Sequence, residues 1–229
     1  MNQPMHAPYG GASINAAQRN RVLRNTYALL AVSMLPTVAG AWLGVSTGIV
    51  ANLGMGMSLL LFLGGAFALM WAIEKNKNSP AGVYLLLAFT FFMGLMLSRL
   101  VDRVLGLSNG GTLIMTAFGG TAAVFCTMAM LAGSIKRDLS NIGKFLTVGA
   151  VILIVAMVAN IFLQSSALML TLLVAMLGLF SAFLLYDLKR IMDGGETNYV
   201  SATLAVYLDL YNIFQSLLSL LGIFGGERE

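Results

Sequence analysis

The chain has very few of the residues on which many enzymes and secreted domains depend. Its 229 residues include one cysteine, Cys126, and one histidine, His6. A single cysteine cannot form a disulfide within the chain, and a cysteine-based metal site needs several. One histidine excludes histidine-rich zinc sites, HExxH proteases and Ser-His-Asp triads. We therefore expect a protein that is not an enzyme and that holds no bound cofactor.

Charge is also scarce. Only 10% of the residues are charged, 59% are hydrophobic, and the mean hydropathy is +0.87. A soluble domain has roughly a quarter of its residues charged, so this chain cannot cover a water-facing surface and must lie in a lipid bilayer. The net charge of +4 does not indicate a nucleic-acid partner, because the lysines and arginines form short clusters between apolar runs.

Seven apolar runs are long enough to cross a membrane, which takes roughly 20 residues each. They cover about 27–45, 49–73, 80–101, 112–132, 142–163, 167–191 and 199–224. The first run is too long for a cleaved signal peptide and is followed by further spans. The sequence predicts an all-α membrane protein with seven transmembrane helices. It divides into a polar tail at 1–25, a transmembrane domain at 26–224 and a short C-terminal tail at 225–229.

The basic residues predict the orientation of the chain. Ten lie on the side of the N-terminus and three on the other side. The ten are Arg19, Arg21, Arg24, Lys75, Lys77, Lys136, Arg137, Lys144, Lys189 and Arg190, and the three are Arg99, Arg103 and Arg228. Cytoplasmic loops carry the excess of lysine and arginine. We therefore expect the N-terminus in the cytoplasm.

The seventh run is unusual because it contains Asp209, Asn212 and Gln215. A charged side chain that faces lipid is costly, so such residues face the interior of a helix bundle. We expect this run to be a central helix that helices 1–6 surround. The alternative is a re-entrant segment, which would return the C-terminus to the cytoplasm.

Two aspartates are the candidate functional residues. Asp209 lies about ten residues, or roughly 15 Å, into the seventh run. An acid inside a membrane is a functional hypothesis by default. Asp187 lies near the end of the sixth run, and the turn between the two runs is short. The two helices should therefore pack antiparallel and bring the carboxyl groups within reach. The alternatives are a structural role for Asp209 and an interface role for Asp187, paired with Lys189 or Arg190.

Such a pair has a specific chemistry. Two adjacent carboxylates cannot both ionise cheaply, so they can share one proton near neutral pH. The shared proton would hold two helices together, and its loss would make them repel each other. Asp187 and Asp209 therefore form a candidate pH sensor and gate, and the ionised pair is a candidate Ca²⁺ site.

Polar residues continue along the same face of the seventh helix. Asp209, Asn212, Ser216 and Ser219 follow spacings of three and four residues, which place them on one face. Asn212, Ser216 and Ser219 would then line a polar pathway. Hydrogen bonding between helices explains the same pattern, and the residues alone leave both interpretations open.

Three glycines on the first helix indicate close packing. Gly40, Gly44 and Gly48 recur every four residues. Small residues at this spacing allow two membrane helices to approach closely. We expect these glycines to contact a neighbouring helix.

Several segments resemble a known family. Segments 186–189 (Tyr-Asp-Leu-Lys) and 206–212 (Val-Tyr-Leu-Asp-Leu-Tyr-Asn) resemble the paired-aspartate signature of the Bax inhibitor-1 family. Segments 22–27, 157–164 and 194–199 are similar to its bacterial YccA-like branch. The resemblance implies a seven-helix fold with the last helix in the centre, in the bacterial inner membrane.

The resemblance also implies two functions. Members of the YccA-like branch modulate, as inhibitors, the membrane-anchored protease FtsH, and their N-terminal tail corresponds here to about 1–24. Members with the aspartate pair are pH-sensitive calcium leak channels, and the pair corresponds here to Asp187 and Asp209. In leak channels a basic residue on helix two latches the pair, whereas this chain has no base there before Lys75. An intramembrane aspartyl protease is disfavoured because Leu208-Asp209 lacks the glycine-rich context of that class.

Overall fold

Seven long helices make up the fold. The structure, a computed structural model, describes residues 16–226, and every regular element in that range is helical. The helices are α1 (Ala16–Thr47), α2 (Met55–Asn76), α3 (Pro80–Leu105), α4 (Gly110–Ser134), α5 (Ser140–Leu163), α6 (Ser166–Met192) and α7 (Tyr199–Phe224). Each is long and apolar enough to cross a membrane. The predicted all-α protein with seven transmembrane helices is confirmed.

The first helix begins earlier than its apolar run. α1 starts at Ala16 and has 32 residues, about 48 Å at 1.5 Å per residue, whereas the hydrocarbon core is about 30 Å thick. Hydropathy marks only the apolar part, but the helix continues through the arginine-rich stretch because Val22 and Thr26 are buried against the bundle. The predicted tail at 1–25 is therefore helical from Ala16 on. Residues 1–15 and 227–229 lie outside the described residues.

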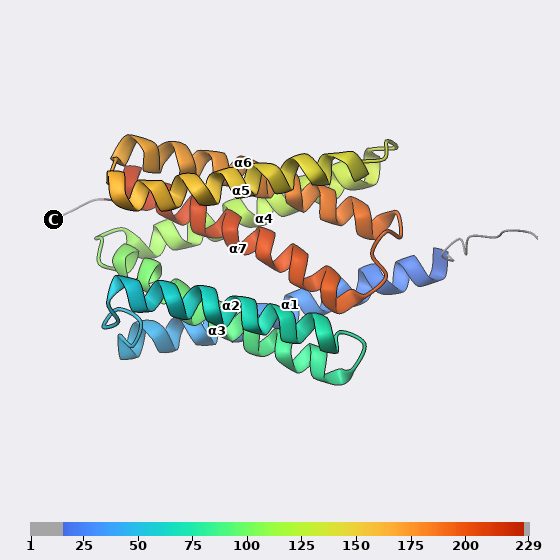
Figure 1. The fold of residues 1–229 in the computed structure, drawn as a ribbon, viewed down its shortest axis with the longest axis horizontal. Coiled ribbons are helices and arrows are strands. Elements are labelled where there is room, and N and C mark those ends of the chain that lie inside the picture. Colours follow the sequence, from blue (N-terminus) through green and yellow to red (C-terminus); the bar gives the residue numbers. More distant parts are fainter. Residues whose placement is uncertain (1–15, 227–229) are drawn as a thin grey trace, which may run out of the picture.

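The bundle consists of two groups of three helices with α7 between them (Figure 1). One group contains α1, α2 and α3, and the other contains α4, α5 and α6. α7 contacts α1, α2, α3, α4 and α6, and half of its most apolar stretch is buried, the largest share of the seven spans. The sequence predicted that helices 1–6 would surround the seventh. In the part of the chain that the structure describes, α5 does not contact α7. Within the described residues α5 contacts α6 alone, because the short turn at Gln164 folds it onto the outer side of that helix.

The helices alternate in direction, so their connections gather at two ends (Figure 1). We call the end at which α1 begins the basic end. It also holds the α2–α3, α4–α5 and α6–α7 connections, and therefore the segments that carry most of the lysines and arginines. α7 is one continuous helix of 26 residues that ends at the opposite end. α7 therefore runs from one end of the bundle to the other and does not turn back as a re-entrant segment would.

Two glycines allow α1 and α3 to touch. A Cβ atom on Gly40 would lie 2.1 Å from the carbonyl oxygen of Phe91, and one on Gly44 would lie 2.3 Å from the Ser98 hydroxyl. Gly94 of α3 lies equally close to the backbone of Thr37. Gly48 was expected in the same contact but is not in it. It follows the last residue of α1 and has a φ of +65°, so its role is in the turn.

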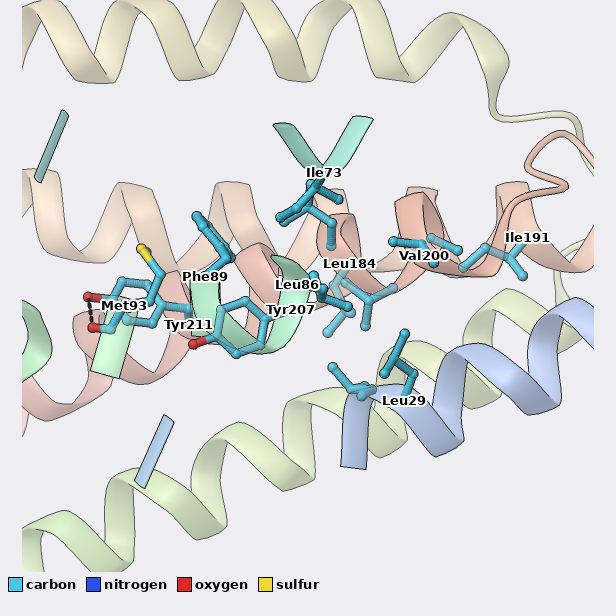
Figure 2. Close-up of a cluster of buried hydrophobic side chains, with 14 of the residues drawn as sticks. Leu29, Ile73, Leu86, Phe89, Met93, Leu184, Ile191, Val200, Tyr207 and Tyr211 are labelled. Carbon is cyan, nitrogen blue, oxygen red and sulfur yellow. Dashed lines mark hydrogen bonds between the residues drawn. The ribbon is translucent and has the colours of Figure 1, made fainter. Parts of the chain in front are cut away.

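The buried side chains lie chiefly where α7 meets the first group and α6. Figure 2 shows Leu86, Phe89 and Met93 of α3 beside Tyr207 and Tyr211 of α7. Leu29, Ile73, Leu184, Ile191 and Val200 extend this cluster toward the basic end (Figure 2). In a bilayer, lipid removes the hydrophobic drive for helices to associate, so close packing and hydrogen bonds hold the bundle together.

The Gly40→Ala variant tests the α1–α3 contact. The new methyl group would overlap the Phe91 backbone, which cannot move aside as a flexible side chain can. Overpacking costs about 1–3 kcal/mol, so we expect a melting temperature several degrees lower in detergent. Gly64→Ala in α2 is the matched control, because a Cβ there meets nothing within 4 Å. Equal melting temperatures for the two variants would contradict the close approach.

Candidate functional site

Asp209 is buried in the interior of the bundle. It lies in the first half of α7, and only 4% of it is exposed. Its Oδ2 atom has no hydrogen-bond partner within the described residues. An unsatisfied buried carboxyl oxygen costs free energy. A functional role is one reason for a protein to keep such a group.

Asp187 of α6 is the neighbour of Asp209. It lies five residues before the end of α6, and the carboxyl groups of the two aspartates lie close enough to interact electrostatically. Ionised carboxylates are acceptors only, so a hydrogen bond between two of them would require that one carries a proton. The fold therefore brings near each other the two acids that the sequence singled out, and the shared proton stays a prediction.

No basic side chain is hydrogen bonded to this pair within residues 16–226. Lys189 Nζ lies 2.7 Å from Asp193 Oδ1, and Arg190 is paired with Glu196 at 3.4 Å. The two bases considered as partners of Asp187 are thus engaged elsewhere. Arg190 and Glu196 still act on Asp187 through longer-range electrostatics.

Lys75 does not latch the pair either. Its ammonium group lies 5.0 Å from the centre of the Trp71 ring, a cation–π contact on the outside of α2. Within the described residues, no salt bridge therefore includes Asp187 or Asp209.

The other polar residues of α7 do not join the pair. Asn212 donates to the carbonyl of Leu208 in its own helix at 2.8 Å. Ser216 is fully buried and its Oγ has no partner within the described residues, and Ser219 is partly exposed. No hydrogen bond links these side chains to Asp209 in the part of the chain that the structure describes. The polar pathway stays a prediction.

Two tyrosines on another part of α7 attach it to the first group. The Tyr207 hydroxyl shares a hydrogen bond with Thr37 Oγ1 at 2.9 Å, and the Tyr211 hydroxyl donates to the Met93 carbonyl at 3.4 Å (Figure 2). Sequence reasoning missed both residues. The available signal was their spacing of four residues inside an apolar helix, where a buried hydroxyl needs a partner.

Asn198, in the α6–α7 connection, is hydrogen bonded to the α2–α3 connection. Its Oδ1 accepts from the amides of Val200 and Ser201, which caps α7. Its Nδ2 donates to the Lys77 carbonyl at 3.1 Å and to Asn78 Oδ1 at 2.8 Å. A sequence shows a capping residue but not its distant partners, so this bridge at the basic end was not predictable.

Glu74 supports the same junction. It accepts a hydrogen bond of 2.9 Å from the Ser201 hydroxyl and is paired with Lys77. The hydrogen bond that Lys77 donates to Glu74 raises the pKa of Lys77 above its ordinary value. Lys77 therefore stays charged across the physiological range.

The described residues hold no group of three or more His, Cys, Asp or Glu side chains that could bind a metal ion. Ca²⁺ takes six to eight oxygen ligands. Asp187 and Asp209 would supply only part of that set.

Comparison with known proteins agrees with the fold. A family model described as "Inhibitor of apoptosis-promoting Bax1" matches residues 19–226. The chain is 38% identical to "Modulator of FtsH protease YccA" of Escherichia coli, over 89% of this chain and 90% of that protein. It is 39% identical to an uncharacterized protein of Neisseria meningitidis, over 93% and 95% of the two chains.

A more distant relative extends the match. An uncharacterized membrane protein of Vibrio cholerae is 34% identical over 97% of this chain and 98% of its own length. The matches run through all seven helices and leave no large segment unaccounted for. The chain is a multi-pass protein of the bacterial inner membrane, and it belongs to the Bax inhibitor-1 family, close to YccA.

Proposed function

We propose that this protein is a non-enzymatic modulator of FtsH in the inner membrane, where it slows degradation of membrane proteins. The observation that carries the proposal is the 38% identity with the E. coli protein named as a modulator of that protease, over nine tenths of both chains. Members of one family that match over their whole length commonly keep the same partner. The other relatives in this comparison have uncharacterized names and favour no competing function.

The position of α1 supports this function. α1 begins at Ala16 at the basic end, which the charge bias predicts to be cytoplasmic. The N-terminal segment joins the bundle there, at the far end from Phe224 of α7. A partner that recognises this segment would therefore meet it on the cytoplasmic side.

Deletion of residues 2–15 tests the role of the tail. This change leaves α1 and its arginines in place, so the fold should persist. In cells that overproduce the full chain, we expect a membrane substrate of FtsH to have a longer half-life, and we expect the deletion to return the half-life to the level of cells without the protein. The half-life is measured by pulse-chase labelling.

The matched control removes residues 227–229, which follow α7 in the sequence. This variant should protect the substrate as the full chain does. A tail-deleted protein that is present at normal level and still protects the substrate would show that the tail is not the contact.

A second candidate function is a proton-gated leak for Ca²⁺ or another cation. The observation that favours it is the proximity of Asp187 of α6 and Asp209 of α7, of which Asp209 is buried and Asp187 is partly buried. In this second proposal the two acids share one proton. Loss of that proton places two negative charges side by side in a medium of low dielectric constant, where their repulsion is strong. The repulsion would push α6 and α7 apart and would create an anionic site for a cation.

The shared proton makes stability depend on pH. The pair attracts while it holds one proton and repels when it holds none, so we expect the melting temperature of the wild type to fall between pH 6 and pH 8.5. Asp209→Asn keeps the shape and donates a hydrogen bond that does not titrate, and it should remove most of this fall. Asp102→Asn is the control, because Asp102 is exposed near the end of α3. Parallel pH profiles for all three proteins would contradict the shared proton.

Flux through liposomes tests the leak itself. With purified protein and a Ca²⁺ indicator inside the vesicles, we expect wild-type flux to rise from pH 6 to pH 8 as the pair loses its proton. Asp209→Asn should abolish the pH dependence, and Asp102→Asn should retain it. Flux no greater than that of empty liposomes at every pH would rule out the leak and would leave the proposed FtsH role untouched.

A further inference from the structure

We propose that a cleft at the basic end binds the headgroup of an anionic phospholipid. The cleft lies between the first turns of α1 and the α6–α7 connection, and its volume is about 630 Å³. It is lined by Gln18, Arg21, Val22, Asn25, Thr197 and Tyr199, among others. The proposal depends on neither function proposed above.

The polar groups of the cleft are donors that suit a phosphate. Gln18, Arg21 and Asn25 are spaced by three and four residues, so one face of α1 presents them together. In residues 16–226, no other side chain or backbone group is hydrogen bonded to the side chains of Gln18, Arg21 or Asn25. An arginine guanidinium matches two phosphate oxygens at once, and the amides can bind the remaining oxygens.

Arg21 forms no ion pair with a carboxylate within the described residues. No acidic residue lines the cleft. Near this end, Glu74 is paired with Lys77, Asp193 with Lys189 and Glu196 with Arg190, Asp187 lies beside Asp209, and Asp138 also has a partner. Residues 1–15 contain neither aspartate nor glutamate. A ligand from outside the chain can therefore supply the counter-charge of Arg21.

The depth of the cleft favours a lipid as its source. Val22 on its lining is buried in the apolar core cluster, and Tyr27, little more than one turn further along α1, packs edge-on against Phe125 of α4. The cleft thus lies where the arginine-rich start of α1 gives way to its apolar part. Arginine and tyrosine at this level mark the membrane interface, and basic pockets between helices on the cytoplasmic side bind anionic headgroups.

Lipid binding to the purified protein in detergent tests this site. Native mass spectrometry would compare dioleoyl-phosphatidylglycerol with dioleoyl-phosphatidylcholine, which has the same acyl chains and no net charge. We expect tighter binding of phosphatidylglycerol to the wild type. Arg21→Gln should weaken that binding by about five- to tenfold, since one basic side chain near a membrane surface contributes about 1 kcal/mol and a charged hydrogen bond adds to it. Phosphatidylcholine binding should not change.

Arg103→Gln is the matched control, because Arg103 is an exposed arginine in the last turn of α3, at the opposite end of the bundle. It should bind phosphatidylglycerol as the wild type does. Equal binding of the two lipids to the wild type would overturn the proposal, and that comparison needs no variant. Equal weakening by both substitutions would show attraction to net charge only. Displacement of the lipid by millimolar inorganic phosphate would show a site for free anions instead.

Discussion

The fold depends on the burial of one helix that carries more polar groups than a membrane span can expose. α7 contains an aspartate and two tyrosines on its buried surface, and in lipid each of these would lack a partner. The two groups of three helices supply those partners. α1 and α3 accept the tyrosine hydroxyls, and α6 supplies Asp187. The polar groups thus explain why α7 lies between the two groups.

The attachments of α7 differ in kind on its two sides. Toward α1 and α3 they combine large apolar side chains with hydroxyl hydrogen bonds, next to the close glycine contact between α1 and α3. Toward α6 the contact includes Asp187 and Asp209, the two carboxyl groups of the proposed pH sensor. In that proposal, the α6 side is the side of α7 whose attachment responds to pH.

The seven helices could be predicted from the sequence because each span is a long apolar run. Such a run is a strong signal that tertiary contacts rarely override. The Asp187–Asp209 contact was predictable for a related reason, since a short turn forces α6 and α7 to pack antiparallel. The extension of α1 through Arg21 was not predictable, because hydropathy measures preference for lipid and not helicity. The Asn198 bridge and the isolation of α5 from α7 depend on how helices distant in sequence are arranged, which no local pattern encodes.

The helix that joins the two groups is also the last one in the chain. A ribosome that makes this protein delivers α1 to α6 to the membrane before α7 exists, so neither group can dock on its final partner during most of synthesis. Asp187 precedes Asp209 in the chain, so its helix is made first. A protein truncated before Tyr199 would keep the α3–α4 and α1–α6 contacts but would lack the helix that lies between the two groups.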